Sequence, residues 1–271
     1  MALGALAVSG RTSTTIAAPT TKHSQTSTAM TVLDSESLDR QVMARSLGMF
    51  SKYWHLGRVK TRLASDVGDR TAALIHQRFT LHLAQQLPAS GHDCTLFTTP
   101  DDACAAMQVA LGESWTVRPQ GPGDLGQRMA KACQVLMQQT GISARTDVIL
   151  VGADLPSLTA ADITAAFDDL LDTEMVLGPA CDGGYYLIGL RGPWQDRYHR
   201  FFDAIPWSTN VVLERTIEAA HLLGIKPRLL AVREDIDTIH ALQRGLTSAS
   251  IPSCLRDWIQ HTLTGGPLTC E

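Results

Sequence analysis

The sequence predicts an α/β fold in which helices cover both faces of a mostly parallel sheet, giving three layers. From Ser46 onward, short apolar runs alternate with segments of helical periodicity, which is the pattern of successive βαβ units. The run from Val148 to Val151 contains only apolar residues, as expected of a strand that is buried on both faces of a parallel sheet. The chain has 271 residues, 44% of them hydrophobic, so it can bury a large core.

The strands are predicted from short apolar runs that are bounded by glycine, proline or polar residues. In chain order they are 46–50, 94–98, 115–118, 147–151, 175–178, 185–190 and 228–232. The helices are predicted from apolar residues at a spacing of three or four. One begins at Asp69 as its cap and ends before Pro88. The others are 101–111, 125–139, 160–171, a helix that Ser208 caps and Gly224 ends, and 238–244.

The two ends of the chain differ from this alternating pattern. Residues 1–40 are rich in Ser, Thr and Ala, and no acidic residue occurs before Asp34. We predict a disordered leader there, either a stretch upstream of the true start or an organellar transit peptide. No repeat or linker divides residues 46–246, which are predicted to form the domain. Residues 247–271 are predicted to be a tail with one short amphipathic helix.

Composition excludes several classes of protein. The net charge of −4 argues against binding nucleic acid through a broad basic face. No apolar run approaches the roughly 20 residues that a membrane span needs. The six cysteines form no CxxC pair and no zinc-like cluster, which favours a reduced, cytoplasmic protein unless the leader directs it to an organelle. The oligomeric state stays open.

Three aspartates follow predicted strands and are candidates for a metal site. Asp154 closely follows the predicted strand 147–151, at the edge where α/β sheets bind ligands. Asp235 and Asp237 follow the last strand and flank one apolar residue. Carboxylates at two such strand ends would hold Mg²⁺ or Mn²⁺. The alternative is that Asp154 and Asp237 only cap the helices that come next.

A basic segment follows the first predicted strand. It holds Gly57, Arg58, Lys60, Thr61 and Arg62, with three cations within five residues. Arginine, lysine and backbone N–H groups at a strand end suit phosphate oxygens. The alternative is a solvated basic loop, and the spacing does not match a Walker motif.

Two glycine-rich segments also lie at predicted strand ends. Gln120 opens the first, in which Gly123, Asp124, Leu125 and Gly126 precede a helix; glycines there would let a base or ribose approach the backbone. The alternative is a plain loop with Asp124 as a helix cap. Its match to the dinucleotide fingerprint is discounted, because prolines interrupt the turn.

The second glycine-rich segment runs from Asp182 through Gly183 and Gly184 to Tyr185. Two glycines beside an acid at a sheet edge favour contact with a ligand. The alternative is a hairpin turn without a ligand.

Together these segments resemble a known family. The resemblance rests on seven motifs in order: Lys52–Tyr53, Gly57–Ala64, Gly123–Met129, Gly152–Pro156, Gly178–Leu190, Ile205–Thr209 and Asp235–Thr238. The resemblance covers about residues 46–246. The chain resembles small bacterial transferases with a glycosyltransferase-A-like fold, of the radical-SAM/selenodomain-associated or arsenosugar-biosynthesis type. That family is similar to the phospholactate and molybdopterin nucleotidyltransferases. Here Trp54 and Leu56 replace two prolines of the usual motif, so this loop lacks two residues that would make it rigid.

The resemblance implies a nucleotide-diphospho-sugar transferase fold and a role for each motif. Lys60 and Arg62 would hold nucleotide phosphates and take part in catalysis with Asp154, and Gln120 to Gly126 would line the base. Asp154 and Asp237 would bind the metal. The sugar or acceptor would contact Asp182–Tyr185 and the segment Trp207, Ser208 and Thr209.

The sequence therefore predicts a metal-dependent transferase that uses a nucleotide-activated donor. Glycosyl transfer from a nucleoside-diphosphate sugar to a small molecule is the leading prediction. Nucleotidyl transfer from a triphosphate to a phosphorylated acceptor is the alternative, because a basic loop suits three phosphates at least as well as two. A nucleotide-binding module without catalysis is a further alternative. The base, sugar, acceptor and stereochemical outcome stay open.

Overall fold

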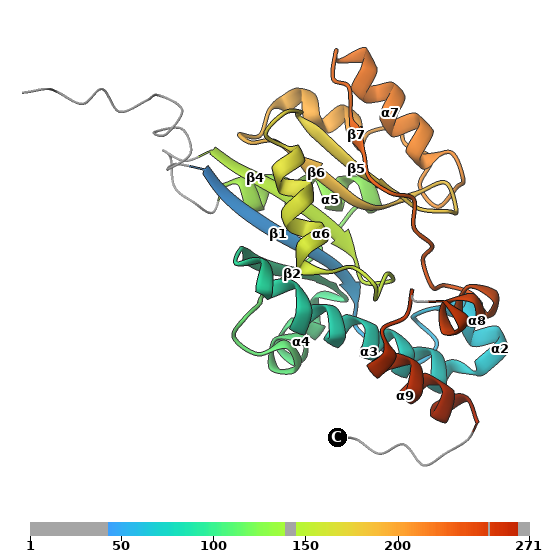
Figure 1. Ribbon diagram of the computed structural model, residues 1–271. Helices are drawn as coiled ribbons and strands as arrows, with labels where there is room; N and C mark the ends of the chain where they lie inside the picture. The colour runs from blue at the N-terminus through green and yellow to red at the C-terminus, as the bar shows by residue number, and fades with distance from the viewer. Residues whose placement is uncertain (1–42, 139–144, 249, 265–271) are drawn as a thin grey trace, which may run out of the picture.

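A seven-stranded sheet is the centre of the fold in the computed structural model, which describes residues 43–138, 145–248 and 250–264 (Figure 1). The strands are β1 Met43–Lys52, β2 Asp93–Thr99, β3 Thr116–Pro119, β4 Arg145–Gly152, β5 Met175–Pro179, β6 Tyr185–Leu190 and β7 Arg228–Leu229. Their order across the sheet is β3-β2-β1-β4-β6-β5-β7. Only the two pairings of β6, with β4 and with β5, are antiparallel. The predicted α/β fold with a mostly parallel sheet is confirmed.

Helices cover both faces of this sheet. They are α2 Thr61–Val67, α3 Asp69–Gln86, α4 Cys104–Leu111, α5 Leu125–Gln138, α6 Ala160–Asp169, α7 Val212–Leu222, α8 Ile239–Thr247 and α9 Ser253–Leu263, with short 3₁₀ turns at Leu87–Ser90, Asp101–Ala103 and Asp196–Phe201. Within the described part of the chain, no helix is long and apolar enough to cross a membrane.

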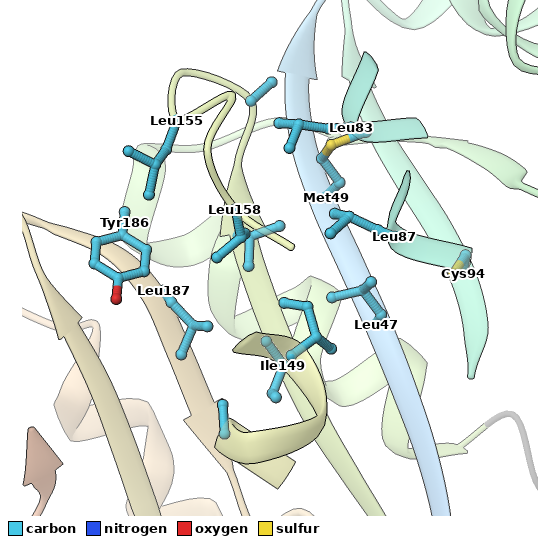
Figure 2. Close-up of a cluster of buried hydrophobic side chains, with 14 of the residues drawn as sticks. Leu47, Met49, Leu83, Leu87, Cys94, Ile149, Leu155, Leu158, Tyr186 and Leu187 are labelled. Atoms are coloured by element: carbon cyan, nitrogen blue, oxygen red, sulfur yellow. The ribbon is translucent and has the colours of Figure 1, made fainter. Parts of the chain in front are cut away.

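One face of the sheet packs against α3, α4 and α6. Figure 2 shows Met49 of β1 beside Leu83 of α3, with Leu47 of β1, Ile149 of β4 and Leu187 of β6 in the same cluster. All five side chains are fully buried. Alternate residues of β4, such as Leu150, point to the opposite face, because successive side chains of a strand alternate.

The opposite face packs against α5 and α7. Met129, Cys133 and Leu136 of α5 lie in one buried cluster with Leu150 of β4 and Ile188 of β6. The fold thus has three layers, and the carboxyl ends of β1, β2, β3 and β4 meet at one edge of the sheet. Ligands of open α/β sheets bind at such an edge.

A third cluster joins α2 and α3 to the last two helices of the described chain near this edge. Leu63 of α2, Ile75 and Phe79 of α3 and Leu242 of α8 are buried together with Ile259 of α9. Figure 1 shows α2, α8 and α9 gathered around one end of α3. The segment predicted as a tail therefore contributes a helix to the core. The predicted leader and residues 265–271 lie outside the described residues.

Several predicted local features are wrong. Ser208 does not cap α7, since it has a left-handed backbone (φ 65°) and the helix begins four residues later at Val212. Asp69 is the first helical residue of α3 rather than its cap, and Gly68 stands at the cap position. The last strand shortens to Arg228–Leu229. The last two residues of the basic segment, Thr61 and Arg62, are helical, because α2 begins at Thr61.

Candidate active site

Asp154 stands just beyond β4, at the edge where the parallel strands end. Thr159 and Asp162 cap the helix that follows. Thr159 Oγ1 accepts the backbone N–H of Asp162 at 3.2 Å, and Asp162 Oδ2 accepts the backbone N–H of Thr159 at 2.9 Å. Asp154 is therefore not a helix cap. Its carbonyl oxygen accepts a hydrogen bond of 3.1 Å from the N–H of Ile236. This bond holds the segment after the last strand against the end of β4.

The same bond brings Asp237 beside Asp154. Asp237 is also free of a capping role, since Thr238 caps α8 by accepting the N–H of Ala241 at 3.2 Å. The pair of carboxylates predicted at two strand ends is thus brought together. Asp235 lies near them and one of its carboxylate oxygens is buried without a hydrogen-bond partner. Burial and the charges of Asp154, Asp237 and Asp182 raise its pKa to about 7, against the opposing effect of Lys60.

Lys60 joins the two carboxylates. Its Nζ lies 2.7 Å from Oδ1 of Asp154 and 3.1 Å from Oδ1 of Asp237, and it donates to the carbonyl oxygen of Ile236 at 2.7 Å. The Lys60 side chain is 2% exposed, against 39% and 44% for the two aspartates. Burial lowers the pKa of Lys60, but the two carboxylates outweigh burial and raise it. Lys60 is therefore a buried, charged group and not the exposed phosphate ligand that the basic segment predicts.

His76 of α3 is a site residue that the sequence analysis missed. Its Nε2 lies 2.9 Å from the carbonyl oxygen of Lys52, and its Nδ1 lies 3.6 Å from Oδ1 of Asp154. A carbonyl can only accept, so Nε2 carries a proton and Nδ1 faces the carboxylate. Burial acts to raise the pKa of Asp154, but Lys60 and then His76 hold it well below its usual range. The one sequence feature that could have pointed to His76 is its position on the apolar face of α3, next to Ile75.

A cavity of about 630 Å³ opens at this edge of the sheet. Nine of the predicted site residues line it: Lys60, Thr61, Arg62, Gln120, Leu125, Asp154, Tyr185, Ser208 and Asp237. Lys52, His76 and Arg128 also line it, and they were absent from the predicted site. Lys52 and Arg62 are exposed and have no ion-pair partner among the described residues. These two side chains are free to meet an anion in the cavity.

The other predicted residues lie outside the lining: Gly57, Arg58, Gly123, Asp124, Gly126, Asp182, Gly183, Gly184, Trp207, Thr209 and Asp235. Several have structural roles that explain their type. A Cβ on Gly126 would lie 2.5 Å from Nε1 of Trp207, so this glycine allows Trp207 to pack on α5. Asp124 accepts the N–H of Gln127 at 2.9 Å, which is the capping role left open by the sequence.

The second glycine-rich segment is also held by local contacts. Gly183 has a φ of 89° and its carbonyl accepts the N–H of Leu213 at 2.9 Å, while Asp182 accepts the N–H of Gly184 at 2.9 Å. Tyr185 reaches the cavity, and its ring meets that of Trp207 edge-on with 6.4 Å between centroids. Trp207 thus supports the wall of the cavity through Tyr185.

In the part of the chain that the structure describes, no three His, Cys, Asp or Glu side chains are grouped closely enough to hold a metal ion by themselves. The arrangement is instead two carboxylates that share one cation, beside a cavity with free cationic side chains. Mg²⁺ commonly binds to one or two carboxylates and completes its coordination with substrate phosphates and water. Asp154 and Asp237 fit that mode of binding.

Comparisons with known proteins agree with this architecture. Residues 80–209 match the family described as uncharacterized protein conserved in bacteria (DUF2064). A solved structure described as a "putative nucleotide-diphospho-sugar transferase" from Desulfovibrio desulfuricans G20 is 27% identical, with a TM-score of 0.72, over 83% of this chain and 99% of that chain. A phosphoenolpyruvate guanylyltransferase of Chloroflexus aggregans is 30% identical over 181 residues, which are 63% of this chain and 81% of that protein. The chain therefore belongs to the family of the Chloroflexus aggregans protein and has the nucleotide-diphospho-sugar transferase fold.

Proposed function

We propose that this protein is a nucleotidyltransferase. It would transfer the nucleotidyl group of a nucleoside triphosphate to a phosphorylated small-molecule acid and release pyrophosphate. The observation that carries the proposal is the 30% identity to a phosphoenolpyruvate guanylyltransferase, because this chain covers 81% of that protein. The sequence analysis placed glycosyl transfer first and nucleotidyl transfer second, whereas this proposal places nucleotidyl transfer first.

The charges around the cavity support this reaction. Lys52 and Arg62 are free cations at the cavity, and Lys60 and Arg128 also line it. A triphosphate and a phosphorylated acid together carry several negative charges, which such side chains would bind and neutralise. The cavity volume of about 630 Å³ lies within the range of small-molecule sites.

The proposed reaction forms one P–O bond and breaks one. An oxygen of the acceptor phosphate attacks the α-phosphorus, a new P–O bond forms, and the bond from the α-phosphorus to the oxygen that bridges to the β-phosphorus breaks. The electron pair of that bond leaves with pyrophosphate. The acceptor phosphate is already an anion at neutral pH, so the reaction requires no general base. Lys52 and Arg62 would orient the phosphates and stabilise the charge on the leaving pyrophosphate.

Asp154 and Asp237 would hold the Mg²⁺ or Mn²⁺ ion. When bound, such an ion neutralises charge on the phosphate oxygens during displacement. The two aspartates fit it because their oxygens already converge on one cation, the Lys60 ammonium. Asp235 lies near them with one buried and unpartnered oxygen, but the three acids are not grouped closely enough to form a site of three carboxylates.

Glycosyl transfer is the second candidate. The solved structure from Desulfovibrio desulfuricans, described as a "putative nucleotide-diphospho-sugar transferase", favours it, with 27% identity over 99% of that chain. In that reaction a diphosphosugar would place its sugar near Tyr185, and a nucleoside diphosphate would leave.

The test is a pyrophosphate-release assay in which each of the four ribonucleoside triphosphates is incubated with phosphoenolpyruvate or other phosphorylated acids and Mg²⁺. The proposal predicts pyrophosphate only when both substrates are present. Matched assays follow diphosphate release from diphosphosugars. Diphosphate release from a sugar donor, without pyrophosphate from any triphosphate, would favour glycosyl transfer. No turnover with either class of donor would favour the remaining alternative, a nucleotide-binding module without catalysis.

A further inference from the structure

The donors of the Lys60 ammonium are fully used by the protein. An ammonium has three N–H donors, and Lys60 contacts three oxygens, one each of Asp154, Asp237 and Ile236, at 2.7, 3.1 and 2.7 Å. The side chain is 2% exposed. In this position Lys60 has no donor left for a phosphate. It acts as the counter-ion of the two aspartates.

The backbone keeps Lys60 in this place. Lys60 has a φ of 44° and a ψ of 47°, a left-handed conformation that is unusual for a residue with a side chain. Such a conformation costs on the order of 1 kcal/mol or more and persists when the surroundings fix it. Here the carbonyl of Lys60 accepts the N–H of Ala64 at 2.8 Å at the start of α2. The turn therefore directs the side chain inward, while the next residues, Thr61 and Arg62, face the cavity.

Lys60 contacts one oxygen, Oδ1, of each of the two carboxylates assigned above to the metal ion. A divalent ion bound to Asp154 and Asp237 would lie at about 2.0–2.6 Å from their oxygens. Lys60 Nζ lies at 2.7 and 3.1 Å from the same oxygens. Two cations so close together repel strongly in a partly buried site. An ion bound through these two Oδ1 atoms would therefore compete with the Lys60 ammonium for one position.

We infer that Lys60 is an exchangeable counter-ion that makes metal binding depend on phosphate. Without phosphate, Lys60 neutralises Asp154 and Asp237 and keeps divalent ions out. A ligand with a polyphosphate group offers the ammonium new oxygens in the same cavity, so Lys60 turns to the phosphate as the ion takes its place. The inference rests on one part of the proposed function, which is that the metal ion and the phosphate groups bind in the same cavity.

This exchange has a thermodynamic signature. If phosphate raises the affinity for the ion, the ion must raise the affinity for phosphate by the same factor. Removing the Lys60 charge should break the dependence, because the ion would no longer have to displace a bound cation. Removing another cation of the same cavity should not, because it is not paired with the aspartates.

The test measures Mn²⁺ binding by electron paramagnetic resonance, without nucleotide, for the wild type, Lys60→Met and Arg62→Met. Lys60→Met should bind Mn²⁺ roughly tenfold more tightly than the wild type or better, as expected for the loss of a competing partly buried ion pair. Arg62→Met is the matched control, since it removes one exposed cation from the same cavity, and it should change the affinity by no more than about twofold. Equal affinities of Lys60→Met and wild type, or an equal gain in both variants, would overturn the inference.

A second measurement on the wild type covers the case in which Lys60→Met does not fold. Mn²⁺ alone should leave the melting temperature almost unchanged, whereas Mn²⁺ with inorganic tripolyphosphate should raise it by more than the sum of the separate effects. A full shift with Mn²⁺ alone would contradict the exchange. If these metal results hold but no triphosphate releases pyrophosphate, the proposed function fails and the inference stands.

Discussion

Asp235 provides a prediction about stability that the structure allows to be worked out in size and sign. Burial, together with Asp154, Asp237 and Asp182, raises its pKa from 3.8 to about 7. The folded protein therefore binds more protons at this group than the unfolded chain does between these two pH values. Stability should fall as pH rises through that window. The full difference corresponds to on the order of 4 kcal/mol, and relaxation of a partly buried site would reduce it to about 2–4 kcal/mol.

Asp235→Asn removes this titration and keeps the shape of the side chain. The free energy of unfolding in urea is measured for wild type and variant from pH 4 to pH 8, in EDTA and at constant ionic strength. The two proteins should be nearly equally stable at pH 4, and the variant should become more stable by about 2–4 kcal/mol at pH 7 and above. Asp182→Asn is the control: it is exposed, keeps its acceptor for Gly184, and should differ by less than about 0.5 kcal/mol. A difference that does not depend on pH, or an Asp235→Asn variant that is less stable at pH 8, would refute the reasoning.

Three further substitutions test other parts of the structure. Asp154→Asn should lower turnover by at least about 100-fold, because it removes a charge that pairs with Lys60 and would hold the metal ion. Unfolding should stay cooperative, because the Asp154 side chain is 39% exposed. Steady-state kinetics and urea unfolding measure the two effects. Gly126→Ala should destabilise the fold by about 1–3 kcal/mol, since its Cβ would lie 2.5 Å from Trp207, and a loss below 0.5 kcal/mol in urea would contradict the packing role. Ile259→Ala, at a fully buried position of α9, should cost about 2–5 kcal/mol in the same assay, and a near-neutral change would mean that α9 does not belong to the core.

The strands and the sheet edge could be predicted because a strand that is buried on both faces consists almost entirely of apolar residues. The apolar run of β4 is buried on both faces, and its end marks the place of Asp154. Because parallel strands end at one edge, Asp154 and Asp237 were expected to lie together, and both lie within 3.1 Å of Lys60 Nζ. The family resemblance gave the nucleotide-diphospho-sugar transferase fold, which is confirmed.

The burial of Lys60 could not be predicted. Lysine is rarely buried, so a basic segment implies exposed charges, and only the folded chain brings two carboxylates and the carbonyl of Ile236 to its ammonium. His76 was missed for a related reason, since a single histidine on an apolar helix face is commonly a packing residue. The packing role of Gly126 could not be predicted either, because its partner, Trp207, is far away in sequence.

The path of the α-phosphorus tests the central claim most directly. A nucleoside triphosphate labelled with ³²P at the α-position is incubated with phosphoenolpyruvate, Mg²⁺ and the protein, and the products are separated by ion-exchange chromatography. Nucleotidyl transfer predicts that the label moves into a new compound joined to the acceptor while unlabelled pyrophosphate forms in equal amount, and that Asp154→Asn abolishes both. Label that stays in the triphosphate with every base and acceptor, while a separately labelled diphosphosugar releases labelled nucleoside diphosphate, would contradict the account.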